Sequence, residues 1–278
     1  MVKNRTKIKL GNFLILLIIL MMLSLAQAKA SHSEKESQEE FFQNLPLNVQ
    51  GNFALDNING LVQIMTWPQP MVEIKAIKKT KKDLKHLKLV RIEIKSTEDR
   101  IIVKTVYPRQ RNIEVSVDYE IKLPENLAET SLKVINGQIK ILGPLSRVKA
   151  TTVNGSIESQ GPIGSADFSA VNGAIEAKIT SGPTRIETVN GAINCYLYSL
   201  IDNLFLETVN GPIEIKIASE GKLNAYLEAK TTNGAIVVDF PIVFQGMTKE
   251  KGYLEGQIGQ GGPLMRLRTI NGSIRLSR

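Results

Sequence analysis

The sequence predicts an all-β protein in which an antiparallel β region continues into a β-solenoid, or β-helix-like, stack. Two observations lead to this prediction. Apolar and charged residues alternate through residues 47–123, as in strands that bury one face. After that, the pair Asn-Gly followed by a fixed Ile recurs at a near-constant spacing, which is typical of stacked repeats. Aromatic residues make up only 5% of the chain, so the core is expected to be aliphatic.

The first 28 residues have the three parts of a secretory signal peptide. Four bases and no acid precede an apolar run over residues 13–25, and Ala26-Gln27-Ala28 follows as a small-x-small site. We expect export to the periplasm or cell surface with cleavage after Ala28, and an uncleaved membrane anchor is the alternative. Removing the four bases lowers the net charge from +8 to +4, which favours neither a nucleic-acid nor a membrane partner.

The remaining chain is predicted to form a charged leader and one β domain. Residues 29–44 have no apolar period and predict a flexible leader. The domain covers residues 45–278. Its first part, residues 45–130, reads as an antiparallel meander, because short polar breaks separate the alternating segments. Residues 131–278 contain the repeats.

Each repeat is predicted to form two short strands that meet at Asn-Gly. From Asn136 onward the Asn-to-Asn steps are 18, 18, 18, 20, 23 and 38 residues, and Asn59-Gly60 is an early copy. A single unit cannot bury its apolar face, whereas stacked units can bury a continuous ladder. The predicted structural positions are Asn136, Gly137, Ile139, Asn154, Gly155, Ile157, Asn172, Gly173, Ile175, Asn190, Gly191, Ile193, Asn210, Gly211, Ile213, Asn233, Gly234, Ile236, Asn271, Gly272 and Ile274.

Asn-Gly itself allows two interpretations. It can be the two-residue turn of a hairpin, because both residues tolerate positive φ. It can also be the corner of a parallel solenoid coil in which equivalent Asn side chains stack. The uniform Ile column favours the solenoid. Residues 245–263 interrupt the last step with six glycines and are predicted to form a loop.

The chain offers few residues for catalysis or metal binding. His32 and His86 are the only histidines, and Cys195 is the only cysteine, predicted to be a buried apolar side chain. We therefore expect no catalytic residues, cofactor or metal. Glu158, Glu176 and Glu214 recur in one outward column, where a glycosidase would need paired acids, but a solvated polar column is the favoured interpretation.

The repeat units and the closing segment resemble a known family. Thr/Val-x-Asn-Gly-x-Ile recurs, and residues 254–276 carry Gly-x-Ile-Gly-x-Gly-Gly before a final Thr-x-Asn-Gly-Ser-Ile. Together with Asn59-Gly60 and Trp67, these features resemble the DUF4097 group of exported bacterial proteins, which are described as adhesins by inference. The resemblance covers most of residues 45–278. It implies a β-helix-like fold, a cell-envelope location and no established catalytic residues.

These observations predict a non-catalytic scaffold or adhesion module of the cell envelope. A cell-surface glycan or an envelope protein is the expected kind of partner. A periplasmic sensor that regulates a membrane signalling protein is one alternative, and a carbohydrate-active enzyme on a β-helix is the other.

Overall fold

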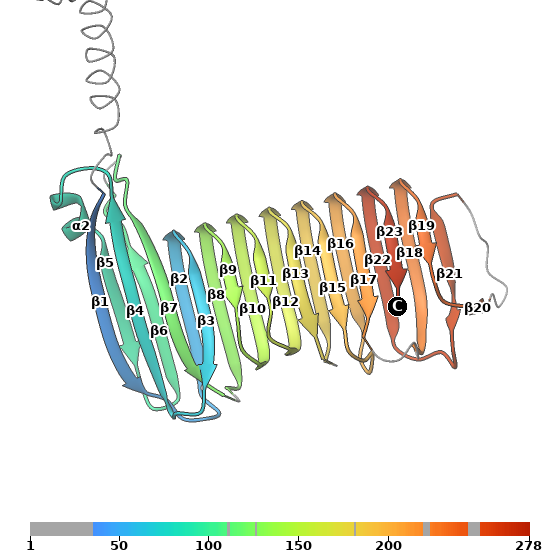
Figure 1. The fold of residues 1–278 in the computed structure, drawn as a ribbon, viewed down its shortest axis with the longest axis horizontal. Helices are drawn as coiled ribbons and strands as arrows, with labels where there is room; N and C mark the ends of the chain where they lie inside the picture. The colour runs from blue at the N-terminus through green and yellow to red at the C-terminus, as the bar shows by residue number, and fades with distance from the viewer. Residues whose placement is uncertain (1–35, 110–111, 126, 181, 219–222, 244–250) are drawn as a thin grey trace, which may run out of the picture. The chain divides into compact units, whose positions relative to one another are not determined.

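Successive two-stranded coils stack along one axis between Ser37 and Arg278 (Figure 1). The computed structural model describes residues 36–109, 112–125, 127–180, 182–218, 223–243 and 251–278. Each coil contributes one strand to each of two walls, and Asn-Gly forms the bend between them. The all-β stacked fold predicted from the sequence is confirmed.

The first wall, called here the Asn wall, consists of the strands that end at the repeated Asn. In stack order these are β2 (Asn52–Asn59), β8 (Glu129–Asn136), β10 (Leu145–Asn154), β12 (Ile163–Asn172), β14 (Thr184–Asn190), β16 (Leu204–Asn210), β22 (Leu264–Asn271) and β18 (Ala225–Asn233).

The second wall, called the Ile wall, consists of the strands that follow the bend. In stack order these are β3 (Val62–Trp67), β9 (Ile139–Ile141), β11 (Ile157–Ser159), β13 (Ile175–Ile179), β15 (Ile193–Leu197), β17 (Ile213–Ile217), β23 (Ile274–Ser277) and β19 (Ile236–Val238).

The coils pair in parallel and in register, so equivalent residues lie side by side. Asn154 is the partner of Asn172 in the Asn wall, and Ile157 is the partner of Ile175 in the Ile wall. The hairpin interpretation of Asn-Gly is wrong, because a hairpin would make the two strands of a unit antiparallel neighbours. It would also need positive φ at the repeated Asn, whereas Asn112 is the only non-glycine residue with positive φ in the described ranges.

The order of coils in space differs from their order in the chain. Strand β22 pairs with β16 on one side and β18 on the other, so the last coil of the sequence lies inside the stack (Figure 1). β21 (Tyr253–Ile258) then covers the other edge of β18 as an antiparallel strand, and β20 (Ile242–Val243) pairs with β21. The predicted loop over residues 245–263 is therefore wrong for β21, and residues 244–250 lie outside the described ranges.

The first part of the domain is a mixed structure. β1 (Ser37–Pro46), β4 (Met71–Thr80) and β7 (Ser116–Pro124) are antiparallel neighbours, as are β5 (Arg91–Ser96) and β6 (Arg100–Val106). However, β6 lies parallel to β2 and β7 lies parallel to β3. The meander predicted for residues 45–130 is thus wrong for β2 and β3, which form a coil of the stack. A short helix, α2 (Lys85–Leu89), occupies one of the predicted breaks.

The flexible leader predicted for residues 29–44 is wrong from Ser37 onward. These residues belong to β1, which pairs with β4 along its full length. Phe41 packs partly against the core, and Lys78 of β4 forms an ion pair with Glu39 at 3.0 Å. The sequence did not predict this strand, because a strand at a sheet edge tolerates polar side chains and so lacks a clear apolar period.

Inward columns of aliphatic side chains fill the space between the walls. Six of the seven predicted Ile positions have no exposed surface: Ile139, Ile157, Ile175, Ile193, Ile213 and Ile274. Ile236 is half-buried, because β19 has a neighbour on one side only among the described strands. Cys195 is buried in the same core.

Candidate binding face

The bends between the walls carry an unbroken ladder of eight asparagines. Seven of the eight side-chain amides donate a hydrogen bond to the Oδ1 of the Asn in the preceding coil, at 2.8–2.9 Å, and the amide of Asn59, the first of the ladder, donates to the Val115 carbonyl at 3.5 Å. The ladder includes Asn59 at one end and Asn233 at the other, so it crosses the chain's change of coil order without interruption. In-register stacking of a short amide side chain explains why the same residue recurs at every bend.

Glycine follows each Asn because the coils approach too closely for a side chain. A Cβ at Gly173 would lie 1.8 Å from the carbonyl oxygen of Gly155, and one at Gly191 would lie 2.1 Å from that of Gly173. In five coils, Thr two residues before the Asn satisfies this carbonyl. The Thr188 hydroxyl donates to the Gly173 oxygen at 2.9 Å, and equivalent bonds are made by Thr152, Thr208, Thr231 and Thr269. The repeat Thr-x-Asn-Gly is therefore a hydrogen-bonding unit.

An exposed aliphatic ladder runs beside the asparagines on the outer face of the Asn wall. It consists of the residue immediately before each Asn. Six consecutive coils carry Ile135, Val153, Val171, Val189, Val209 and Ile270. Val189 is 41% exposed and Ile270 is 47% exposed, whereas Val209 is half-buried. Contiguous exposed apolar surface of this kind marks interaction sites more often than scattered apolar residues do.

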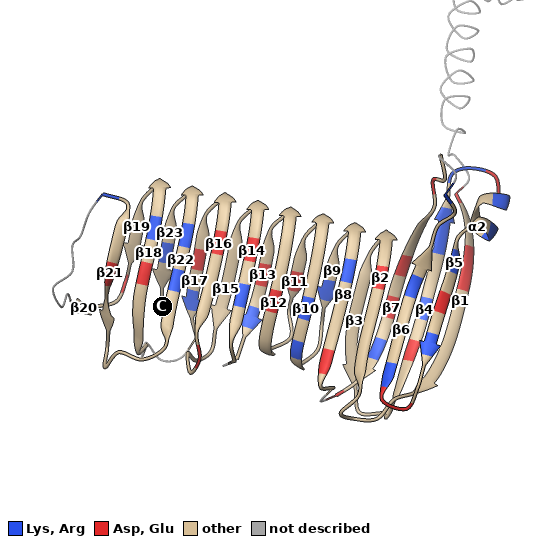
Figure 2. Cartoon of the chain, turned by 180° about the vertical axis from the view of Figure 1, so that it is seen from behind, with Lys and Arg blue, Asp and Glu red and all other residues tan. Residues whose placement is uncertain are grey.

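A shallow groove of about 650 Å³ follows this ladder over the coils of Asn172 to Asn233. One side is formed by the aliphatic ladder. The other side is formed by the residues three positions before each Asn, which in stack order are Ser169, Glu187, Glu207, Arg268 and Lys230. The groove therefore combines an apolar side with a charged one, and acidic and basic segments lie on neighbouring strands here (Figure 2).

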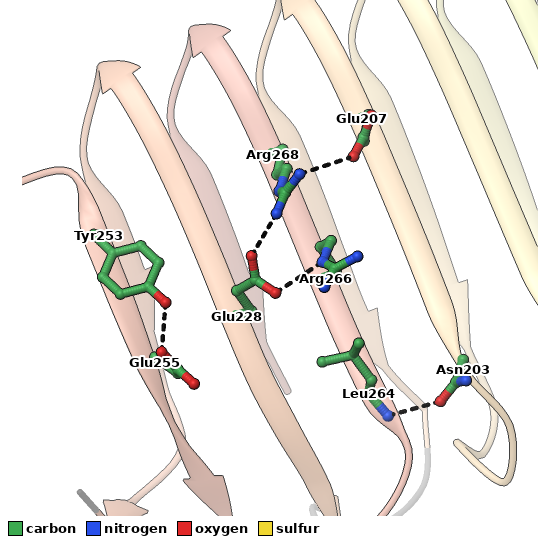
Figure 3. A network of polar contacts seen from close by, with 8 residues as sticks. All are labelled: Asn203, Glu207, Glu228, Tyr253, Glu255, Leu264, Arg266 and Arg268. Carbon is green, nitrogen blue, oxygen red and sulfur yellow. Dashed lines mark hydrogen bonds and ion pairs between the residues drawn. The ribbon is translucent and has the colours of Figure 1, made fainter. Parts of the chain in front are cut away.

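Ion pairs order the charged side of the groove (Figure 3). Glu228 accepts hydrogen bonds from Arg268 at 2.7 Å and from Arg266 at 2.8 Å, and Arg268 also lies 3.9 Å from Glu207. Partial burial raises the pKa of Glu228, but the hydrogen bonds from the two arginines outweigh this effect and hold the pKa below its usual value. Glu228 is thus charged and holds the side chains of Arg266 and Arg268 in place.

Phe205 lies between two guanidinium groups on the same face. The centre of its ring is 5.4 Å from Arg185 and 5.6 Å from Arg266. Arg185 also binds Glu187 at 2.6 Å. This arrangement gives the face a second ordered row, five positions before each Asn, with Arg185, Phe205, Arg266 and Glu228 in stack order.

A tyrosine–carboxylate contact lies on β21, beside this face (Figure 3). The Tyr253 hydroxyl donates to Glu255, and this hydrogen bond raises the pKa of Tyr253 to about 12. Tyr253 therefore stays protonated at physiological pH and acts as a donor.

The predicted acidic column lies on the outer face of the Ile wall, away from the groove. Glu158 and Glu176 are register partners on β11 and β13, but Asn194 separates Glu176 from Glu214. Glu158 accepts from Gln160 at 2.6 Å and lies 3.6 Å from Lys140. Two of the three acids are therefore brought together, within a column that contains both signs of charge.

The other candidates for chemistry lie apart from one another. Burial raises the pKa of Cys195 to about 12, so its thiol stays protonated. His86 lies in α2, and His32 lies outside the described residues. No group of three His, Cys, Asp or Glu side chains in the described ranges could hold a metal ion. Residues 1–28 also lie outside the described ranges. Within the described ranges, no helix is long and apolar enough to cross a membrane.

Comparison with known proteins gives structural likenesses only. No protein-family model matches the chain, and no curated protein sequence matches it. A candidate cell adhesion protein from Clostridium sporogenes ATCC 15579 shares 13% identity over 87% of this chain and 99% of its own, with a TM-score of 0.36. A candidate adhesin from Bacteroides fragilis NCTC 9343 shares 8% identity over 87% and 98%, with a TM-score of 0.44.

A third structure, a candidate adhesin from Parabacteroides distasonis ATCC 8503, shares 13% identity over 88% of this chain and 97% of its own, with a TM-score of 0.33. TM-scores this low carry no argument about function. Membership of the DUF4097 group therefore stays a prediction.

Sequence reasoning placed the Asn, Gly and Ile columns but missed the exposed ladder. The signal was present in the sequence, because the residue before the Asn is Val or Ile in six of the seven repeats from Asn136 onward. Alternation along the strand predicts that this residue points outward. An apolar residue at the same outward position of nearly every repeat is the observation that would have identified the face.

Proposed function

We propose that the chain is a non-catalytic binding module of the cell envelope that engages its partner through the outer face of the Asn wall. The exposed aliphatic ladder is the observation that supports this proposal. Parallel strands repeat about every 4.8 Å, so the six ladder residues form one continuous strip. A strip of this kind offers a partner apolar contact area, and the charged side of the groove offers it orientation.

A binding role fits the chemistry of the face better than a catalytic one. Catalysis needs a group whose pKa is tuned toward reaction, whereas the acids and bases here hold one another charged. Glu228 is kept anionic by two arginines, and the Cys195 thiol is buried and protonated. The envelope location follows from the signal-peptide pattern of residues 1–28.

A pull-down from envelope extract tests the proposal. The chain is used as bait beside the variant Val171→Arg/Val189→Arg, which places two charges in the ladder. We expect the parent to retain a specific component and the variant to lose it, because each arginine would have to be desolvated against an apolar surface.

The matched control is Tyr198→Arg/Ile201→Arg. These two side chains are 46% and 71% exposed but lie outside the ladder, so this variant should bind as the parent does. A glycan or structural envelope protein among the retained components indicates a scaffold or adhesion role, and a membrane signalling protein indicates the sensor role. Equal retention by the parent and the ladder variant would refute the proposed face.

A further inference from the structure

We infer that the partner of this face is a second copy of the same chain, bound with its stack axis reversed. The inference rests on the proposed function of the Asn wall and adds the identity of its partner. It comes from the order of charges along the stack. When a second copy is placed with its coils in the opposite order, acids of one copy face bases of the other.

The four coils of Asn190, Asn210, Asn271 and Asn233 carry this pattern. In stack order, the row three positions before each Asn contains two acids followed by two bases, namely Glu187, Glu207, Arg268 and Lys230. The row five positions before each Asn contains Arg185, Phe205, Arg266 and Glu228. The ladder contributes Val189, Val209, Ile270 and Thr232.

Consider a two-fold axis that runs parallel to the strands and passes between β16 and β22. This axis turns one Asn wall to face the other, reverses the order of coils, and leaves each row opposite itself. In the first row Glu207 then faces Arg268 of the second copy, and Glu187 faces its Lys230. Every acid of this row therefore meets a base.

Three of the four facing pairs in the other two rows are also favourable under the same operation, and the fourth places Val189 opposite Thr232. Arg185 faces Glu228 of the second copy, and Phe205 faces its Arg266, which repeats the ring–guanidinium contact already made within one chain. Val209 faces Ile270 of the second copy, so apolar surface covers apolar surface. A turn about the stack axis through the middle row instead would place the ladder opposite the polar row and each charge of the middle row opposite its own copy, so that Arg268 would face Arg268, which is repulsive.

The pattern also limits the contact. One coil further out, Asp167 would face Glu255 of the second copy, which are like charges, so the complementary area is confined to four coils. These coils extend about 19 Å along the stack and about 23 Å along the strands. The resulting area of about 440 Å² is roughly half of the 800 Å² that each partner of a stable complex buries. The contact is therefore weak alone and gains strength where many copies meet on a surface.

Crosslinking of single-cysteine variants tests this register. The full chain is expressed, and the form that the cell produces is purified and treated with a short bismaleimide. Cys195 is buried and therefore should not react with the reagent. Facing sheets are about 10 Å apart, so two copies of Val209→Cys would lie about 11 Å apart and should crosslink. Val153→Cys lies on the same ladder and is more exposed than position 209, but its two copies would lie about 35 Å apart and should not crosslink.

Charge exchange gives a second, independent readout. Glu187→Lys alone would face Lys230 of the second copy and should raise the dimer dissociation constant about tenfold in sedimentation velocity. Glu187→Lys combined with Lys230→Glu should restore it. Equal thermal midpoints for all variants would show that folding is unaffected.

Two results overturn the inference: Val209→Cys crosslinks no more than Val153→Cys, or the chain sediments as a monomer at every concentration. The dimer tests can be negative while the parent retains an envelope component in the pull-down that the variant Val171→Arg/Val189→Arg does not retain. In that case the proposed face stands, and its partner is that component. If both experiments are negative, the proposed function fails as well.

Discussion

At the scale of single residues, the bend of five coils is specified by three residues with separate tasks. The Thr hydroxyl satisfies a carbonyl, the Asn amide continues the ladder, and Gly permits the close approach of adjacent coils. The Thr188 hydroxyl, for example, reaches the Gly173 carbonyl at 2.9 Å, where a Cβ on Gly191 would collide. The three residues recur together because Gly allows the carbonyl of the adjacent coil to approach and the Thr hydroxyl then satisfies that carbonyl.

Removing one Asn from the middle of the ladder should cost more stability than removing the last one. Asn172 donates to Asn154 and accepts from Asn190, whereas Asn233 only donates, to Asn271, within the described residues. At about 1 kcal/mol for each hydrogen bond, we expect Asn172→Ala to lower the free energy of unfolding by about 2 kcal/mol, and Asn233→Ala by about half as much. Chemical denaturation followed by circular dichroism measures both variants, and equal losses would show that the ladder bonds contribute little.

At the scale of strands, each coil is stable only through its neighbours. β11 has three residues and β9 has three, which is too short for independent stability. Parallel neighbours on both sides complete their backbone hydrogen bonds, and the inward Ile of each coil contacts the Ile of the next. The Ile column is therefore a property of the stack and cannot be assigned to any single strand.

A charge in the Ile column should unfold the stack locally or completely. Ile193 has no exposed surface, so Ile193→Asp would bury an unpaired carboxylate or force its protonation. We expect a loss of about 3 kcal/mol or more, in the range seen for large-to-small core changes with an added polar group. The neighbouring outward change Asn194→Gln is the control and should leave the thermal midpoint nearly unchanged. Similar midpoints for the two variants would contradict the assigned inward direction of Ile193.

Much of this element-scale structure could be predicted from the sequence, because stacking repeats the same contacts at every coil. The spacing of Asn-Gly and the uniform Ile position led to parallel coils in register. Two features could not be predicted. β1 lies at an edge, where its polar residues give no periodic signal, and the coil of Asn271 carries the same repeat as every other coil, so its pattern fits any place in the stack. Only the pairing of β22 with β16 and β18 fixes that place.

At the scale of the whole molecule, the stack is nearly one-dimensional. Each coil touches the coil on either side, and the antiparallel strands β1, β4 and β21 belong to the ends of the stack. Stability in such a molecule is close to a sum over coils and their interfaces. Its length can therefore change by whole coils without altering the remaining contacts.

Deleting one complete coil should preserve the fold. Removal of residues 155–172 joins Asn154 to Gly173, which are equivalent neighbours of the stack 18 residues apart in the ladder. We expect a cooperative unfolding transition with a moderately lower midpoint, since one interface is lost. Removal of β12 alone, residues 163–172, deletes half a coil and leaves β13 without its bend. That variant should fail to fold, and equal behaviour of the two deletions would contradict the one-dimensional description.

The polarity of the Asn ladder has a consequence for chemical ageing. Asn-Gly pairs lose ammonia when the glycine nitrogen attacks the asparagine side chain, and water then opens the resulting ring to an acid. Inside the stack the nitrogen of Gly173 is bound to the Asn190 carbonyl, and the Asn172 side chain is held on both sides. At Asn233-Gly234 no described residue accepts from that nitrogen. Deamidation during storage, followed by peptide mass spectrometry, should therefore begin at Asn233 and spare Asn172. The protein would then deteriorate from one end, and the modified fraction at Asn233 would record the age of a protein sample.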